Sequence, residues 1–112
     1  MTKNLDSVGL SSIAHSYDLF YIDLWGVVHN GIKLYKDAII ALKELKKNNK
    51  DFVLLTNAPR PNGTVKNFLE KMGMEEEFRN HVFTSGEAAL IYLKKTHLSK
   101  KFFHIGPPRD FD

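Results

Sequence analysis

Residues 17–31 read YDLFYIDLWGVVHNG, and this segment predicts the first strand of the fold and the candidate functional residue that follows it. An apolar, aromatic run ends at Ile22, and Asp23 follows directly. A short apolar run bounded by turn-forming residues is typical of a buried parallel strand. In an open α/β sheet, ligands bind outside the carboxyl ends of such strands. We therefore expect Asp23 at the functional edge of a sheet, although a lone aspartate there is more often a turn cap or an edge carboxylate.

The composition fits one small domain. The chain has 112 residues and 43% hydrophobic content, and its net charge of +3 is mild. The lysines fall at scattered helix ends, which is not the pattern of a nucleic-acid-binding face. The absence of cysteine excludes a disulfide, a thiolate zinc site and a cysteine nucleophile. No signal-peptide pattern or membrane-spanning run is present, so we expect a cytoplasmic protein with no membrane partner.

Strands and helices are expected to alternate along the chain. Short apolar runs predict four strands, at residues 19–22, 52–55, 81–83 and 102–105. Apolar positions at helical spacing predict helices within residues 6–15, 38–47, 65–72 and 85–93. This order predicts an α/β fold, a three-layer Rossmann-like parallel sheet with helices on both faces. Thr84 and Glu87 have capping-box spacing, and we interpret Ser85, at the start of the last helix, as a cap rather than a ligand.

Polar groups follow two of the predicted strands. Asp23 and a glycine-containing turn follow the first, and Thr56 and Asn57 follow the second. Side by side, they would surround one pocket with a carboxylate, a hydroxyl and backbone N–H groups. Such a pocket suits a phosphate, with a divalent cation offsetting the repulsion from the carboxylate, and an aspartate there can form an aspartyl-phosphate. Taken alone, Thr56 and Asn57 are more simply a helix-entry cap or an Asx-type turn.

Three segments together resemble the haloacid dehalogenase (HAD) superfamily of aspartate-nucleophile phosphotransferases. They are residues 17–31, FVLLTNAPR at 52–60 and VFTSGEAA at 82–89. The chain is most similar to subclass IIA, the NagD-like group with a large cap domain, and the resemblance covers nearly all of it. The resemblance implies a Mg²⁺-dependent hydrolase that acts on a small phosphorylated molecule through an aspartyl-phosphate.

The resemblance also implies a role for each matching residue. Asp23 corresponds to the nucleophile and to a Mg²⁺ ligand, and the backbone carbonyl of Trp25 corresponds to a second Mg²⁺ ligand. The hydroxyl of Thr56 and the N–H of Asn57 correspond to groups that bind the phosphate. Residues 26–31 correspond to the turn and flap that cover the site.

One departure from the family pattern concerns acid–base catalysis. Phosphatases of this superfamily usually carry a second aspartate two residues after the nucleophile, and Trp25 occupies that position here. An indole N–H only donates a hydrogen bond and cannot transfer a proton at neutral pH. General acid–base help contributes ~10²–10⁴-fold in rate, so we expect impaired turnover. His29 is an alternative acid–base group, although a structural or solvated histidine is the simpler interpretation.

The second departure is that the family's lysine motif, later acidic pair and cap domain have no counterpart in the chain. Asp110 and Asp112 follow the last predicted strand too closely to be that pair. We therefore interpret residues 1–112 as a single partial HAD-like core domain, truncated before the cap. The alternative function is an inactive remnant or half-domain that binds a phosphate ligand or a partner chain. An exposed sheet edge and apolar helix faces would favour self-association or pairing with a second-half chain.

Overall fold

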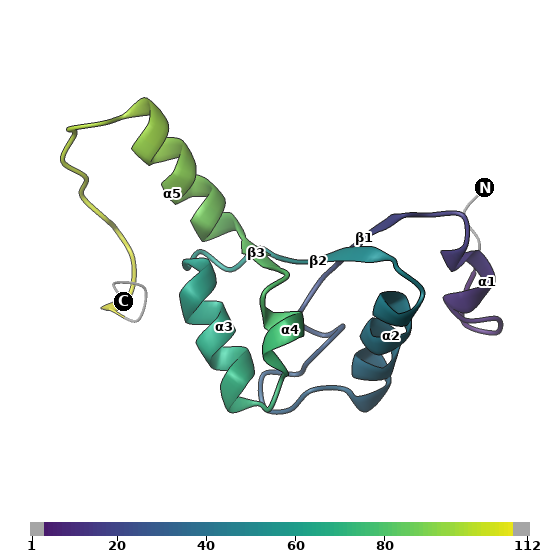
Figure 1. The fold of residues 1–112 in the computed structure, drawn as a ribbon. Helices are drawn as coiled ribbons and strands as arrows, with labels where there is room; N and C mark the ends of the chain where they lie inside the picture. Colours follow the sequence, from purple (N-terminus) through teal and green to yellow (C-terminus); the bar gives the residue numbers. More distant parts are fainter. Residues whose placement is uncertain (1–3, 109–112) are drawn as a thin grey trace.

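The computed structural model describes residues 4–108 as a parallel sheet with helices around it (Figure 1). In chain order the elements are α1 (Ser11–Ala14), β1 (Leu19–Ile22), α2 (Lys36–Lys47), β2 (Asp51–Thr56), α3 (Asn62–Lys71), α4 (Glu76–Arg79), β3 (Val82–Thr84) and α5 (Ser85–Thr96). The strands lie in the order β1-β2-β3. The α/β, Rossmann-like class predicted from the sequence is confirmed. Among residues 4–108, no helix combines the length and the apolar character that crossing a bilayer requires.

The register of the sheet brings the strand ends to one edge. Ile22, the last residue of β1, is opposite Leu54 in β2. Thr56, the last residue of β2, is opposite Thr84 in β3. Because all pairs are parallel, the segment that follows β1 and the segment that follows β2 leave the sheet on the same side. Asp23 and Thr56 therefore lie at neighbouring positions of the carboxyl edge.

The hydrophobic core lies on one face of the sheet, under α2, α3 and α4 (Figure 1). The strands contribute Phe52, Leu54 and Val82 to it, and α4 contributes Phe78, which is 1% exposed. The full set of buried apolar residues is Leu24, Val28, Leu42, Leu45, Phe52, Leu54, Val65, Leu69, Met74, Phe78 and Val82. Burial of these side chains is the main favourable term that holds the helices to the sheet.

The helices that cover this face follow the predicted pattern. In α2 the buried residues are Leu42 and Leu45, and in α3 they are Val65 and Leu69. Each pair is spaced three or four residues apart, so it lies on a single helix face. Gly73, with a φ of +86°, follows the end of α3 in the left-handed conformation that glycine adopts without strain.

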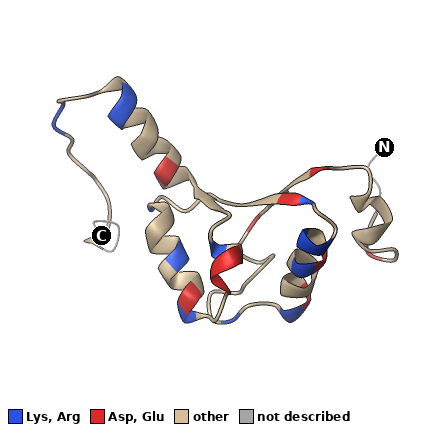
Figure 2. Ribbon diagram, viewed as in Figure 1, with Lys and Arg blue, Asp and Glu red and all other residues tan. Residues whose placement is uncertain are grey.

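Charged side chains lie around this core rather than in it. Figure 2 shows Lys and Arg distributed over α2, α3, α5 and the chain that follows α5. Two lysines of α2 face the acidic segment at α4, where Lys43 pairs with Glu75 at 2.8 Å and Lys46 pairs with Glu77. These pairs are exposed, so solvent and salt screen them.

The opposite face of the sheet is partly bare in the described part of the chain. Leu19, Tyr21, Leu55 and Phe83 point to that face and are exposed, Tyr21 to 71%. Helix α5 starts at the end of β3 but projects away from the sheet, and it contributes no buried residue (Figure 1). The described helices therefore cover mainly one face, and the second helix layer expected from the sequence is not formed by residues 4–108.

The fourth strand predicted at residues 102–105 is wrong. This segment forms no strand, and Phe103 and Ile105 are 90% and 88% exposed. It follows α5, which carries the chain away from the sheet (Figure 1). A strand is stable only when a neighbouring strand accepts and donates its backbone hydrogen bonds, and this segment has no such neighbour in the described part. Asp110 and Asp112 lie outside the described residues.

Candidate active site

Asp23 is the first residue after β1, and its side chain is exposed. Its Oδ1 accepts a hydrogen bond from the backbone N–H of Leu24 at 2.7 Å. Leu24 is only 1% exposed and belongs to the core. The backbone at Asp23 is therefore anchored by its buried neighbour, while the carboxylate itself remains at the surface.

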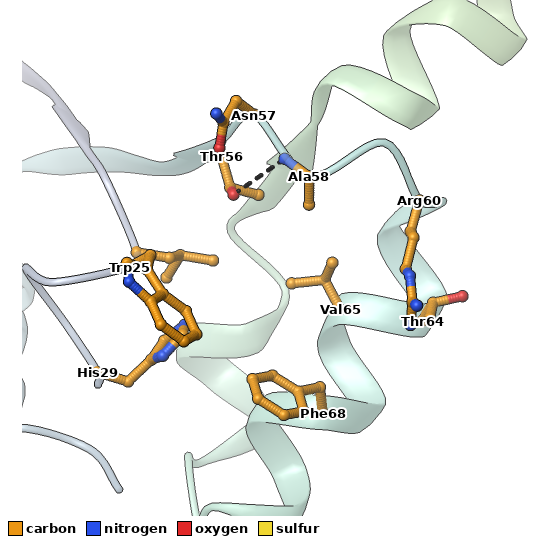
Figure 3. Close-up of a pocket in the computed structure, with 10 residues that line it drawn as sticks. Trp25, His29, Thr56, Asn57, Ala58, Arg60, Thr64, Val65 and Phe68 are labelled. Carbon is orange, nitrogen blue, oxygen red and sulfur yellow. Dashed lines mark hydrogen bonds between the residues drawn. The ribbon is translucent and has the colours of Figure 1, made fainter. Parts of the chain in front are cut away.

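Thr56 and Asn57 mark the point where β2 becomes a loop. Thr56 ends the strand, and its Oγ1 accepts a hydrogen bond from the backbone N–H of Ala58 at 3.2 Å (Figure 3). Pro59 and Pro61 follow, and proline cannot donate to a sheet ladder, so the strand cannot continue. The hydroxyl of Thr56 is held by the turn but keeps its own proton for donation to a ligand.

One open cavity brings the predicted site residues together. Asp23, Thr56 and Asn57 all line a cavity of about 640 Å³ at the carboxyl edge of the sheet. Its other lining residues are Tyr21, Leu55, Phe83, Thr84, Ser85 and Ala88. The nucleophile candidate and the two phosphate-binding candidates, which are far apart in sequence, therefore face the same space.

A second cavity of about 330 Å³ shares Thr56 and Asn57 with the first (Figure 3). Trp25, the predicted carbonyl ligand, lines this second cavity and not the first. Its other lining residues are Leu24, His29, Ala58, Arg60, Thr64, Val65 and Phe68. Thr56 and Asn57 are the residues that line both cavities.

Residues 26–31 form a compact hydrogen-bonded loop next to these cavities. The N–H of Gly26 donates to the carbonyl of His29 at 2.8 Å, and the N–H of Gly31 donates to Nδ1 of the His29 ring at 2.9 Å. Gly31 has a φ of +86°, and a Cβ there would come within 2.4 Å of the Trp25 indole. The loop is therefore closed around His29 and lets the outer edge of the indole approach a glycine.

His29 is buried within this loop, with 4% of its surface exposed. Its ring packs edge-on against Trp25, at 5.5 Å between ring centroids, and against Phe68, at 5.7 Å. Burial lowers the pKa of His29 below its ordinary value, and the nearby charge of Asp23 opposes this effect in part. Because Nδ1 accepts the Gly31 N–H, the neutral ring carries its proton on Nε2. His29 is thus mainly a structural residue of the loop.

The capping-box spacing of Thr84 and Glu87 predicted the cap of α5 correctly, whereas the interpretation of Ser85 as a cap is wrong. Thr84, not Ser85, is the N-cap, since its Oγ1 accepts a hydrogen bond from the N–H of Glu87 at 2.9 Å. Ser85 is the first residue of the helix, and its hydroxyl donates to the carbonyl of Ala58 at 3.0 Å. Ser85 therefore helps to hold the loop after β2 instead of capping α5.

Asn62 and Glu87 form a brace that sequence reasoning missed. Asn62 Oδ1 accepts the N–H of Thr84 at 2.9 Å, and Glu87 Oε2 accepts the N–H of Asn62 at 2.9 Å. The Thr84 hydroxyl also donates to the carbonyl of Arg60. These bonds tie the loop that carries Thr56 to the start of α5. The capping-box spacing indicated Glu87, although not its bond to Asn62, and no local signal indicates Asn62.

Comparison with models of protein families identifies the family of this chain. A family model described as haloacid dehalogenase-like hydrolase matches residues 20–112. The chain belongs to the haloacid dehalogenase-like hydrolases. The match begins within β1 and includes Asp23, Thr56 and Asn57. The resemblance to this superfamily inferred from the sequence is confirmed.

Solved structures are similar to the chain over most of its length. A hydrolase of the haloacid dehalogenase-like family from Brucella suis 1330 is 33% identical with a TM-score of 0.77, over 90% of this chain and 36% of that one. A putative NagD protein is 28% identical with a TM-score of 0.61, over 71% of this chain and 32% of its own. A hypothetical protein from Pyrococcus horikoshii OT3 is 25% identical with a TM-score of 0.58, over 71% and 31% respectively.

This haloacid dehalogenase-like chain spans about a third of the length of those structures. A search of the curated proteins found no match. These similarities establish the family and the likeness of the fold to a putative NagD protein.

Proposed function

We propose that this chain carries the nucleophile and phosphate-binding half of a phosphate-ester hydrolase. The observation that supports the proposal is the shared cavity, in which the carboxylate of Asp23 faces the same space as Thr56 and Asn57. In this proposal a small phosphorylated molecule is the substrate. The cytoplasmic location predicted from the sequence stays part of the proposal.

Asp23 is the proposed nucleophile. A carboxylate oxygen of Asp23 attacks phosphorus, the bond from phosphorus to the ester oxygen breaks, and the leaving group departs with that electron pair. Water then attacks the aspartyl-phosphate, which releases phosphate and restores Asp23. The hydroxyl of Thr56 and the N–H of Asn57 donate to the phosphate oxygens and stabilise the charge that develops there.

In this proposal Mg²⁺ binds weakly at the site, because few protein oxygen atoms are available to coordinate it. Among residues 4–108, no group of three or more His, Cys, Asp or Glu side chains could hold a metal. Mg²⁺ commonly takes one or two carboxylates together with water and substrate phosphate. The carboxylate of Asp23 would supply a protein oxygen, whereas Trp25, whose backbone carbonyl was predicted as a second ligand, lines the neighbouring cavity. The bound ion would reduce the repulsion between the carboxylate and the phosphate.

The proposed reaction lacks efficient proton transfer to the leaving group. Trp25 stands where an acid would be needed, and an indole supplies no proton at neutral pH. The Nδ1 of His29 already accepts the Gly31 N–H, and the lowered pKa of His29 keeps its ring neutral. We therefore propose slow turnover that favours esters whose leaving group is stable as an anion.

The direct test is phosphate release from an aryl phosphate in the presence of Mg²⁺. We expect the wild-type chain to release phosphate slowly and Asp23→Asn to lose this activity. A suitable control is Asp18→Asn, which changes an exposed aspartate just before β1 that does not line the cavity. Equal rates for the wild type and Asp23→Asn would remove Asp23 from the mechanism.

A second candidate function is a half-domain that binds a partner chain without turnover. It is favoured by the exposed apolar face of the sheet, which includes Leu19 and Tyr21. Size-exclusion chromatography with light scattering would test it, with and without a polypeptide that supplies the remaining half of a haloacid dehalogenase-like core. Stable co-elution would support this candidate. A monomer that does not complement the second polypeptide would count against it.

A further inference from the structure

Two apolar surfaces are uncovered in the part of the chain that the structure describes. The first is the exposed sheet surface formed by Leu19, Tyr21, Leu55 and Phe83, which we call the bare face. The second lies on α5, where Ile91 and Tyr92 are 51% and 61% exposed. Exposed apolar patches of this kind commonly mark contacts with another protein surface.

The apolar residues of α5 form a stripe that continues from the bare face. Ile91 and Tyr92 follow Ala88 by three and four residues, so the three lie on one side of the helix. Ala88 lines the larger cavity together with Tyr21 and Phe83 of the bare face. The stripe and the bare face therefore meet at the start of α5. Figure 1 shows α5 leaving the sheet on the side away from α3 and α4.

The first turn of α5 holds the helix in this direction. No residue separates the helix from β3, because β3 ends at Thr84 and α5 begins at Ser85. The N–H of Gly86 donates to the carbonyl of Ala58 at 3.1 Å, and the hydroxyl of Ser85 donates to the same carbonyl. A Cβ at Gly86 would lie 2.5 Å from the backbone N of Arg60, so the helix start is packed directly against the loop after β2. Folding α5 back onto its own sheet would break these contacts.

The α5 of a second copy matches the bare face in length and in charge. Its 12 residues span about 18 Å, and the 6 residues of β2 span about 20 Å. Lys94 and Lys95 occupy the last turn of α5, whereas the exposed Asp18 and Asp51 lie at the amino ends of β1 and β2. A helix antiparallel to the strands beneath it places its lysines beside these aspartates. Lys50 already pairs with Asp18 at 3.9 Å, so Asp51 is the main expected partner.

We propose that two copies of this chain form a symmetric dimer in which the α5 of each copy packs its stripe against the bare face of the other. A two-fold axis makes the two helix–sheet contacts identical, so the dimer covers both apolar surfaces of both copies. Each contact buries Ile91 and Tyr92 on the bare face, and the removal of this apolar area from water drives the association. The lysines of α5 orient the helix more than they add affinity, because they stay at the surface. The dimer does not depend on the proposed hydrolysis.

Light scattering over a range of chain concentrations tests the association. We expect the wild type to form a dimer and Ile91→Lys to raise its dissociation constant about tenfold or more, because each dimer then places two charges in apolar contacts. The matched control is Ile32→Lys, since Ile32 is 83% exposed in the loop between β1 and α2 and belongs to neither surface. Circular dichroism would establish that both variants fold. A monomeric wild type, or a dimer equally stable in both variants, would overturn the proposal.

Cross-linking identifies which surfaces meet. The chain has no cysteine, so each introduced thiol is unique. Lys95→Cys changes the last turn of α5, and Asp51→Cys changes the first residue of β2, both at exposed positions. Oxidation of an equal mixture in air should give a disulfide-linked dimer that contains one chain of each variant, identified by its mass. Each variant alone should give little linked dimer, and linkage within single variants without the mixed product would overturn the proposal.

Two further outcomes would assign the bare face to a different occupant. If a double variant with both substitutions forms an internal disulfide as a monomer, α5 covers its own sheet. If the wild type stays monomeric and associates only with the second half of a haloacid dehalogenase-like core, the bare face belongs to that polypeptide. Either result overturns the proposal. The mixed disulfide, together with the weaker dimer of Ile91→Lys, supports it.

Discussion

At the scale of single residues, the contact between Trp25 and Gly31 determines the shape of the loop over the site. The indole occupies the space where any side chain at position 31 would begin. Gly31 also has a φ of +86°, which L-residues with a side chain adopt only with strain. Trp25 therefore needs a glycine opposite it in order to line the cavity of about 330 Å³.

We expect Gly31→Ala to destabilise the chain by about 1–2 kcal/mol or more, because the left-handed conformation and the clash with Trp25 both oppose the new Cβ. Urea unfolding would measure the change. Gly63→Ala is the matched control, since Gly63 lies in α3 with open space around it and alanine is the better helix former. Equal effects of the two substitutions would show that the contact at Gly31 has no energetic role.

The burial of His29 should make stability depend on pH. Its folded-state pKa is lowered, so the unfolded chain binds the proton more readily. The free energy of unfolding should therefore rise with pH from the folded-state pKa up to about 6.5 and contribute no further slope above that. The charged groups nearby are Asp23, which opposes the shift, and Arg60, which lines the same cavity.

His29→Asn should remove this slope, since an amide does not titrate but can still accept the Gly31 N–H. Urea midpoints of both proteins between pH 5 and pH 8 provide the measurement. The same slope in both proteins would mean that other groups cause it.

Sequence reasoning identified some residues of the site and not others. Asp23, Thr56 and Asn57 follow apolar runs, and the position after a strand is a local property. The spacing of Thr84 and Glu87 predicted the N-cap of α5 correctly, but nothing local showed that the Ser85 hydroxyl donates to the carbonyl of Ala58 instead of capping the helix. Asn62 gave no signal, because its hydrogen-bond partners lie 22 and 25 residues away.

At the scale of elements, the brace between α3 and α5 holds the loop that carries Thr56. Asn62 lies in the first turn of α3, and its Oδ1 accepts a hydrogen bond from the backbone N–H of Thr84, which is completely buried. Loss of the Asn62 amide would leave a buried N–H without its acceptor. An unsatisfied buried N–H lowers the free energy of unfolding by more than an ordinary hydrogen bond contributes to it.

We expect Asn62→Ala to lower the free energy of unfolding by about 1–3 kcal/mol. It should also weaken methylphosphonate binding, because the Thr56 loop loses its support. Asn67→Ala, at an exposed position of the same helix, is the control and should change little. Urea unfolding and calorimetry supply the two measurements. If Asn62→Ala behaves like Asn67→Ala, the brace does not hold the loop.

The three observed strands were predictable because their apolar runs are short, bounded and separated by helical patterns. The run at residues 102–105 has the same composition, yet it forms no strand. The composition of a segment indicates only whether the segment is able to form a strand. Whether it does so depends on a partner edge within reach, and α5 carries this segment away from the sheet.

At the scale of the whole molecule, the sheet is covered on one face and partly bare on the other. Leu19, Tyr21, Leu55 and Phe83 form an exposed apolar surface on the bare face. Surfaces of this kind tend to associate with another protein surface. The chain also spans only about a third of the length of the structures that resemble it.

We expect the chain to self-associate as its concentration rises, and Leu19→Lys to reduce this association by placing a charge on the bare face. Leu19 lines neither of the two cavities of the site, so the substitution should leave phosphonate binding unchanged. Leu98→Lys is the control, because Leu98 is 73% exposed but lies beyond α5. Light scattering would show the difference. Equal association of all three proteins would exclude the bare face as the contact.

The most direct test of the site is to trap the phosphoryl group. The chain would be incubated with an aryl phosphate and Mg²⁺ and quenched in acid, and its peptides would be mapped by mass spectrometry. We expect the phosphoryl group on the peptide that contains Asp23 in the wild type and no such adduct in Asp23→Asn. An adduct on a different residue, or no adduct on Asp23 under conditions in which phosphate is released, would contradict the assignment of Asp23 as the nucleophile.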